Sequence, residues 1–446
     1  MTLFIKKDPK NRTVKIVSAF VLAIFFVILL ASCGEKVSEE PDYNYKGKTD
    51  DYSYEMYDDH VKITGYLGGD VFVSLPLKIG DKFVTEIGEE AFRDNSVIVD
   101  IVFSSKIETV GDYAFYGCSK IETLELGQGI RRIGKNAFAE MAVLSDIKFG
   151  DHVETIDDMA FYNDQKLTAL KFPDSLISLG ENCFSSCTDI SSVKLPGNLK
   201  TIGKGCFSSL RNLKKISIPA GVTVLAESVF ESCEILAEVT LPEGLTEIGD
   251  RAVYNCAALE KINVPDTVTR IGDFAFCGCA SVKEAVLPAG LRSIGESAFE
   301  SCTGITEMTV PDGVTHIGAN AFRYMNIPSL TLPESVETVP EGYLYWCGNI
   351  TEAEIHGKVR TIDRYAFSRC LGITGVTNPD SVKEIRDYAF GGCSSVKTLT
   401  VPDSVTSIEK YAFADCTGLR EVRVKAGSYA ESWFKNSVYA DKIVNY

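Results

Sequence analysis

A repeat of 23 residues runs through most of this 446-residue chain. Aligned on the dipeptide Ala-Phe, apolar residues recur at this interval through about fifteen units, with one residue deleted after Phe322. The aligned positions are Phe92, Phe115, Phe138, Phe161, Phe184, Phe207, Phe230, Val253, Phe276, Phe299, Phe322, Leu344, Phe367, Phe390 and Phe413. One such unit is too short to close a core of its own, so neighbouring units must stack and share one. The periodicity therefore predicts a solenoid.

Each position of the unit A-F-x-x-C-x-x-L-x-x-L-x-L-P-x-x-V-x-x-I-G has a physical role. In the copy that begins at Ala298, the Ala, Phe and Cys are spaced so that one helical turn would point all three inward. Met308 and Val310 alternate as in a short strand, which the following proline ends because it cannot donate to a ladder. We expect Gly318 to provide a turn with positive φ. The residue after this glycine is often acidic, which suits the start of a helical turn.

The unit closely resembles the BspA-like, treponemal-type leucine-rich repeat over roughly residues 52–446. The resemblance implies an α/β solenoid with parallel strands on its concave side and short helical or irregular segments on its convex side. We expect the repeats to occupy residues 81–424. A strand cap is predicted at 52–80 and a C-terminal cap at 425–446, where SYAESWFKNS (428–437) indicates a short helix.

The N-terminus has the pattern of an export signal. Basic residues precede an apolar run that ends at Leu30, and the sequence LASCG around Cys33 resembles the lipobox of bacterial lipoproteins. This implies a signal peptide at 1–32 and lipid attachment at Cys33. The alternative is an uncleaved signal anchor, although the run is shorter than the span of about 20 residues that a bilayer needs. The acidic segment 33–51 is poor in aliphatic residues and is predicted to be a flexible tether.

The cysteines predict a core column and argue against disulfides or metal. Ten of the fourteen cysteines occupy one repeat position, which Met141, Leu210 and Met325 fill in other units, so the position is apolar. Stacked thiols point in the same direction, which is unfavourable for disulfide geometry, and no CxxC pair provides metal-ligand spacing. We expect free buried thiols and the most exposed one at Cys277. The ten are Cys118, Cys187, Cys233, Cys256, Cys279, Cys302, Cys347, Cys370, Cys393 and Cys416.

No pattern in the chain predicts an enzyme. The four histidines are far apart, and neither a G-x-S-x-G elbow nor a phosphate-binding glycine loop occurs. We therefore expect no catalytic residue, no cofactor and no bound metal. The net charge of −16 argues against nucleic acid, because phosphate binding needs a basic surface.

The outward positions of the concave strands are the expected binding face. Ten residues after the repeat phenylalanine, three successive units carry Lys148, Lys171 and Lys194. Like charges at the spacing of neighbouring strands repel one another, so three adjacent lysines do not stabilise the fold and are not required by it. We treat these three residues, the lysine strip, as a candidate partner-binding site. The alternative is that flanking acids such as Asp146 neutralise the strip.

The resemblance implies a protein that binds at the bacterial cell surface. It would be exposed outside the cytoplasm and would contact the membrane through its lipid anchor only. The leading hypothesis is adhesion or protein–protein interaction, with host extracellular matrix proteins or other surface proteins as partners. The alternative is a capture protein for glycan or peptide ligands at the envelope, although the concave column lacks the aromatic residues that favour glycan stacking.

Overall fold

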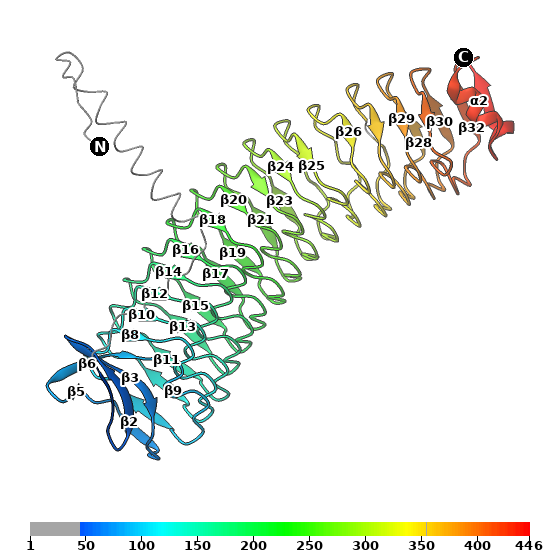
Figure 1. Ribbon diagram of the computed structural model, residues 1–446. Coiled ribbons are helices and arrows are strands. Elements are labelled where there is room, and N and C mark those ends of the chain that lie inside the picture. Colours follow the sequence, from blue (N-terminus) through cyan, green and yellow to red (C-terminus); the bar gives the residue numbers. More distant parts are fainter. Residues whose placement is uncertain (1–44, 354) are drawn as a thin grey trace, which may run out of the picture. The chain divides into compact units, whose positions relative to one another are not determined.

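The structure is a computed structural model that describes residues 45–353 and 355–446. Within them the chain forms a parallel β-solenoid whose turns follow one another in sequence order, as Figure 1 shows. Two columns of short strands run along it. The first strand column contains β4 (Phe72–Ser74), β7 (Asp100–Val102), β9 (Thr123–Glu125), β11 (Asp146–Lys148), β13 (Ala169–Lys171), β15 (Ser192–Lys194), β17 (Lys215–Ser217), β19 (Glu238–Thr240), β21 (Lys261–Asn263), β23 (Glu284–Val286), β28 (Gly375–Thr377), β30 (Thr398–Val401) and β32 (Glu421–Val424).

The second strand column lies four to six residues after each proline turn. Its members pair in parallel within three sheets, and each two-residue strand contributes one buried residue. They are β6 (Lys82–Ile87), β8 (Thr109–Val110), β10 (Arg132–Ile133), β12 (Thr155–Ile156), β14 (Ser178–Leu179), β16 (Thr201–Ile202), β18 (Val224–Leu225), β20 (Glu247–Ile248), β22 (Arg270–Ile271), β24 (Ser293–Ile294), β25 (His316–Ile317), β26 (Thr338–Val339), β27 (Thr361–Ile362), β29 (Glu384–Ile385) and β31 (Ser407–Ile408).

The predicted alternation of buried and exposed residues is confirmed, but the strand predicted at Met308 and Val310 is wrong, because both side chains are buried there without a strand being formed. In β11 the central Ile147 is buried, while Asp146 and Lys148 on either side of it are exposed. The same exposed–buried–exposed pattern recurs in β9, β13, β17 and β21. One side chain per strand therefore builds the core, and two are free to meet other molecules.

The Ala-Phe segment is not the helical turn that the spacing predicts. It is a run of tight turns in which Ser297 and Ser301 adopt positive φ, at 50° and 62°. An α-helix would direct every amide along its own axis, whereas here alternate amides reach the next turn of the solenoid: Phe299 N donates to Ala321 O at 2.8 Å. The segment is therefore a third line of hydrogen bonds between turns, and it still points Ala298 and Phe299 into the core.

The repeat glycine is needed for close approach, and the positive φ predicted at Gly318 is wrong. A Cβ at this position would collide with the backbone of Gly295 and Glu296 in the preceding turn. The positive φ lies two residues later, at Asn320. The acidic residue after the glycine has a different role as well, because no helix begins there: Asp250 Oδ1 accepts a hydrogen bond from the amide of Asp273 in the next turn at 2.9 Å.

Stacked phenylalanine rings fill the centre of the solenoid. Phe115 and Phe138 lie 5.2 Å apart at an interplanar angle of 5°, and similar pairs follow along the array. At the one-residue deletion the backbone of Leu344 keeps the repeat phase, because its amide bonds to Ala366 O as Phe367 N bonds to Ala389 O. Its smaller side chain leaves space that the preceding Tyr343 ring fills, edge-on to Phe322 at 5.5 Å.

The N-terminal cap begins earlier than predicted. The strands β1 (Tyr45–Lys48), β2 (Tyr52–Met56) and β3 (His60–Tyr66) form an antiparallel sheet that continues into the second strand column through β6, with β5 (Lys78–Ile79) beside it. The predicted tether 33–51 is therefore wrong at residues 45–48, because β1 pairs with β2 along its length. The edge contact between the Tyr45 and Tyr54 rings, 6.0 Å between centroids, adds to the pairing.

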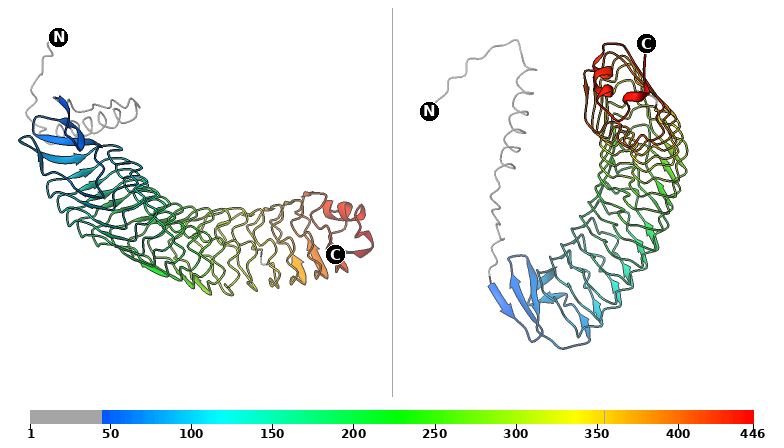
Figure 2. Two further views of the ribbon diagram at one scale, coloured as in Figure 1. Left: turned by 90° about the horizontal axis from the view of Figure 1, so that it is seen from below. Right: turned by 90° about the vertical axis from the view of Figure 1, so that its right-hand side faces the viewer.

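The C-terminal cap contains the predicted helix. It is α2 (Tyr429–Lys435), and the side chain of Ser428 caps it by accepting a hydrogen bond from the amide of Glu431. The short 3₁₀ helix η1 (Ala440–Lys442) and strand β33 (Ile443–Asn445) follow, and β33 pairs in parallel with β32. The strand cap and α2 lie at opposite ends of the repeat array (Figure 2).

The predicted signal peptide 1–32 and Cys33 lie outside the described residues. Among the residues that are described, no helix has the length and apolar character needed to cross a membrane.

Candidate binding surface

The structure places the three residues of the lysine strip on the outer face of consecutive first-column strands. Lys148 ends β11, Lys171 ends β13 and Lys194 ends β15, and all three side chains are exposed. Lys171 and Lys194 are direct register partners in the parallel pair β13–β15. The spacing that the repeat phase predicts for these residues is therefore the spacing that the strands give them.

The charges around the lysine strip are only partly paired. The Lys148 ammonium lies 3.4 Å from a carboxylate oxygen of Glu125, its register partner on β9, and not against Asp146. Within the described residues no carboxylate lies within ion-pair distance of Lys171 or Lys194. Both lysines line a hollow of about 380 Å³ that also contains Asp151 and Asp174. Two cations on this face are therefore available to an anionic group of a partner.

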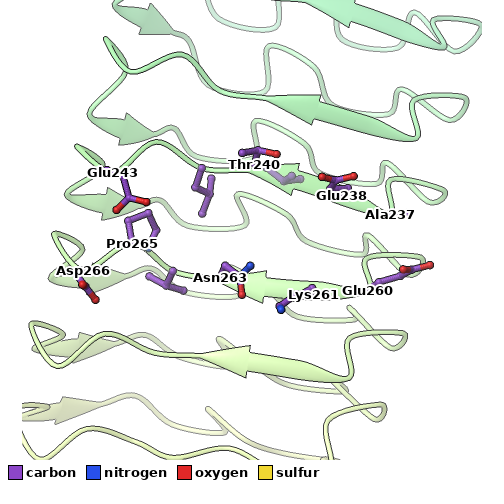
Figure 3. A pocket seen from close by; sticks show the side chains of 12 residues that line it. Ala237, Glu238, Thr240, Glu243, Glu260, Lys261, Asn263, Pro265 and Asp266 are labelled. Atoms are coloured by element: carbon purple, nitrogen blue, oxygen red, sulfur yellow. The ribbon is translucent and has the colours of Figure 1, made fainter.

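A second hollow on the same face is acidic, and the sequence analysis did not single it out. Its volume is about 720 Å³, and it lies between β19 and β21, where the pairing of the first strand column is interrupted. Figure 3 shows its carboxylates, Glu238, Glu243, Glu260 and Asp266, around Asn263 and Lys261. The Lys261 ammonium is drawn to the next turn by Glu284 at 3.1 Å. The strand face thus has a basic section followed by an acidic section.

A metal centre is not indicated at this hollow. No group of three or more histidine, cysteine or acidic side chains in the described part of the chain could hold a metal ion. The four carboxylates lie on two adjacent turns, Glu238 and Glu243 on that of β19 and Glu260 and Asp266 on that of β21, and all four are exposed. The repeat phase could have revealed the hollow, because Glu238 and Lys261 occupy the outward position eight residues after the repeat phenylalanine.

Sequence comparison decides the family to which these turns belong. The chain matches the family described as BspA type leucine rich repeat region (6 copies) in four overlapping segments, residues 77–182, 154–283, 269–397 and 337–444. The protein belongs to the BspA-type leucine-rich repeat family. Among curated proteins, none matches the sequence.

One solved structure shares this fold, and others match over most of the chain with lower structural similarity. A leucine-rich repeat protein from Bacteroides ovatus is 24% identical with a TM-score of 0.67, and the match covers 90% of this chain and 99% of that one. A leucine rich cell surface protein from Faecalibacterium prausnitzii is 23% identical with a TM-score of 0.45, covering 87% and 97%. The pneumococcal vaccine antigen PcpA is 17% identical with a TM-score of 0.46, covering 91% and 98%. The first of these shows the shared fold.

The cysteine column of this BspA-type array is structural. All ten thiols are buried, and each Sγ donates to a main-chain carbonyl of the preceding turn; Cys302 Sγ lies 3.2 Å from Phe276 O. Burial raises the pKa of Cys233 to about 12, so its thiol stays protonated and is a poor nucleophile. Cys277 is the one half-buried thiol among the described cysteines, and burial raises its pKa to about 11.

One repeat carries an acid in this column, and the sequence analysis missed it. Asp164, three residues after Phe161, takes the place of the cysteine and is fully buried. Its Oδ1 accepts a hydrogen bond from the amide of Met141 at 2.7 Å, whereas its Oδ2 has no partner. Burial raises the pKa of Asp164 well above its usual value, against the lowering effect of that amide. The repeat phase alone would have revealed this carboxyl.

Proposed function

We propose that this protein is a lipid-anchored cell-surface protein that binds other proteins, as an adhesin or as an interaction partner of other surface proteins. The observation that carries the proposal is the outer face of the first strand column. Adjacent strands hold its exposed side chains at fixed spacing, and the core uses none of them. Family membership supports a binding role, since leucine-rich repeat arrays are typically binding scaffolds without catalysis.

The segregation of charge on this face favours a protein partner. A basic section at Lys171 and Lys194 and an acidic hollow at Glu238 and Glu260 lie on the same strand column. A partner with the opposite arrangement of charges would be oriented along the array before contact, which raises the association rate and selects against other partners. The first strand column has no exposed aromatic residue among the described positions between β9 and β23, so it offers no stacking platform for a glycan.

The binding face is tested by replacing Lys148, Lys171 and Lys194 with Ser. The matched control replaces three exposed lysines outside the strand face, Lys120, Lys135 and Lys204. Binding to immobilised matrix proteins, fibronectin and fibrinogen among them, is measured at low and high salt. We expect the strip variant alone to bind more weakly and to lose salt dependence, since exposed charges are screened by salt. Equal binding by the strip variant and the wild type at both salt concentrations would exclude the lysine strip as the binding site.

The anchor is tested separately at Cys33. Replacement by Ser should abolish labelling by a fatty-acid probe and leave the protein unprocessed or released. A variant in another cysteine, Cys277→Ser, should be labelled like the wild type. Equal label on the Cys33 variant and wild type would contradict lipid attachment at this residue.

A further inference from the structure

A row of exposed and half-buried aromatic side chains lies on the Ala-Phe turns of the C-terminal part of the array, away from the strand columns. We call it the aromatic ladder. The tyrosine rings contact one another in succession and Trp346 contacts Tyr345, and each member comes from a position one or two residues from the buried repeat residue. Its members are Tyr324, Tyr345, Trp346, Tyr365, Tyr388 and Tyr411.

The ladder is continuous and regular. Tyr365 and Tyr388 stack at 5.3 Å and 5°, and Tyr388 and Tyr411 at 5.3 Å and 16°. Tyr345 joins Tyr365 at 5.7 Å and Tyr324 at 6.2 Å. The rings are therefore held in place before any ligand arrives, so binding would restrict few additional side-chain rotations.

The fold does not require these residues. Asn182, Gly205 and Ser228 occupy the position two residues before the repeat phenylalanine in other turns. Tyr365 and Tyr388 adopt positive φ there, at 57° and 56°, a conformation that disfavours bulky side chains and favours Asn or Gly. Trp346, Tyr365 and Tyr411 remain 41%, 37% and 41% exposed. The ladder thus places large rings in solvent at a conformational cost, which points to a use outside the core.

Cations accompany the ladder along its length. The Arg323 guanidinium lies 4.5 Å from the Tyr324 ring centroid and 4.9 Å from that of Tyr345. Arg369 covers Trp346 at 5.1 Å, and Lys410 covers Tyr411 at 4.8 Å. No carboxylate of the described residues lies within ion-pair distance of Arg369 or Lys410. Arg369 and Lys410 therefore remain without an ion-pair partner in a chain whose net charge is −16, whereas Arg323 is paired with Glu300 at 3.8 Å.

The ladder leads into a cleft at the C-terminal cap. This cleft has a volume of about 700 Å³, and its lining is mostly apolar side chains of β31 and α2 and their neighbours. Tyr411 and Lys410 belong to both the ladder and the cleft, and Trp433 and Tyr439 form its far side. A ligand that follows the ladder would have a deeper site at this end.

The arrangement of the rings selects the kind of ligand. Stacked rings lie on both sides of Tyr388, and the Arg369 guanidinium covers one face of Trp346, so the stacked tyrosines present mainly their edges and hydroxyl groups. A sugar stacks on an open ring face, and the stacking of Tyr365, Tyr388 and Tyr411 on one another takes up ring faces that a sugar would need. Tyrosine, tryptophan and arginine are instead the residues that dominate binding energy at protein interfaces. The two free cations add a preference for carboxylates.

From these observations we infer that the aromatic ladder binds an extended acidic peptide segment of a partner protein, running from Tyr324 to the cleft at the C-terminal cap. Apolar side chains of the segment contact the ring edges and fill the cleft, and its carboxylates meet Arg369 and Lys410. This inference rests on the proposed binding function and assigns it a second surface, distinct from the lysine strip.

The test selects a displayed library of random short peptides against the full-length protein. The ladder variant is Tyr365→Asn with Tyr388→Asn, because Asn occupies this position in other turns and tolerates positive φ. The matched control is Tyr113→Asn with Phe274→Asn, at the same repeat position and also with positive φ but outside the ladder. Arg369→Gln tests the charge, and thermal melting confirms that each variant is folded.

We expect selected peptides rich in acidic and apolar residues, with affinity lowered about tenfold or more by the ladder variant and unchanged by the control. Arg369→Gln should reduce the salt dependence of binding. Peptides that bind the ladder variant and the wild type equally would overturn the inference and leave the proposed binding function intact. The same conclusion would follow from a glycan array if glycans, and no peptides, bound the wild type more tightly than the ladder variant. If neither peptides nor matrix proteins bind the wild type, both proposals are wrong.

Discussion

Single side chains that depart from the repeat show how much the shared core tolerates. Asp164 replaces a thiol, and Tyr343 fills the space beside a leucine in the phenylalanine stack. Each buries an oxygen that has no hydrogen-bond partner, Asp164 Oδ2 and the Tyr343 hydroxyl. Such an atom loses its hydration without compensation, so both sites should lower stability.

Asp164 should make stability depend on pH. Burial raises the pKa of its carboxyl in the folded chain, while the unfolded chain keeps the ordinary value of about 4. Above that value the unfolded state releases the proton while the folded state keeps it. The contribution of Asp164 to stability is therefore fully present below the pKa of the unfolded state and is lost as the pH rises towards the pKa of the folded state. The free energy of unfolding of Asp164→Asn should therefore fall less than that of the wild type as the pH rises from about 5 to about 8.

The measurement is urea unfolding across this pH range. At the upper end the Asn variant should exceed the wild type by about 1–3 kcal/mol. Asp189→Asn is the control, because Asp189 lies in the next turn, is paired at the surface with Lys166 at 3.3 Å, and should change the pH profile little. Parallel pH profiles for wild type and Asp164→Asn would contradict the buried neutral carboxyl.

Tyr343→Phe should stabilise the protein. The substitution removes a buried hydroxyl without a partner and keeps the ring that lies against Phe322 and Phe367. We expect a gain of about 1–2 kcal/mol in the free energy of unfolding. Tyr162→Phe, at a half-buried turn position, should have an effect near zero. A loss of stability in Tyr343→Phe would show that the hydroxyl has a favourable interaction.

At the scale of elements, contacts between equivalent positions of successive turns hold the fold. The third line of hydrogen bonds, the aspartate-to-amide bonds and the thiol-to-carbonyl bonds all join one turn to the next. Their geometry requires the backbones of neighbouring turns to approach closely, and the repeat glycine permits this.

Gly318→Ala should therefore be costly although the φ of Gly318 is not positive. Its Cβ would meet backbone atoms of Gly295 and Glu296, which cannot move without disturbing the strand columns. We expect a loss of about 1–3 kcal/mol in the free energy of unfolding. Gly348→Ala is the control, since a Cβ there meets nothing within 4 Å, and it should change stability by less than about 0.5 kcal/mol. Equal effects of the two substitutions would rule out close approach as the reason for the repeat glycine.

The thiol column should be unreactive in the folded protein. Twelve of the thirteen described cysteines are buried, and burial raises the pKa of column thiols such as Cys302, which keeps them protonated. A thiol reagent near neutral pH should modify Cys277 alone, and slowly, because its pKa is raised to about 11. After unfolding all thirteen should react, and mass spectrometry gives the count. Linked pairs of column cysteines would contradict the core role.

At the scale of the whole repeat array, each turn touches only its neighbours, so damage should remain local. The C-terminal cap depends on Phe434, which is fully buried and lies 5.5 Å from the ring of Phe413. Phe434→Ala should loosen the last turns and leave the first half of the array intact, because the substitution costs about 3–5 kcal/mol at one end.

Hydrogen exchange followed by mass spectrometry checks this prediction. Peptides after residue 400 should exchange faster in Phe434→Ala, and peptides before residue 200 should match the wild type. Phe72→Ala is the control, because Phe72 is 74% exposed and its replacement should leave exchange unchanged. Faster exchange along the whole array would indicate that the turns unfold as one unit.

The repeat phase was sufficient to predict the solenoid, the buried phenylalanine and cysteine columns and the outward lysines, and the local sequence SYAESWFKNS predicted the capping helix at 428–437. It succeeds because burial follows from the position within the unit, and every unit repeats it. The same phase contains Asp164, whose burial could have been predicted. Only the stacked turns reveal that the Ala-Phe segment is a line of hydrogen bonds between turns, that Gly318 is needed for close approach and that Glu125 pairs with Lys148. These features depend on distances between residues of different turns, and those distances are set when the turns pack.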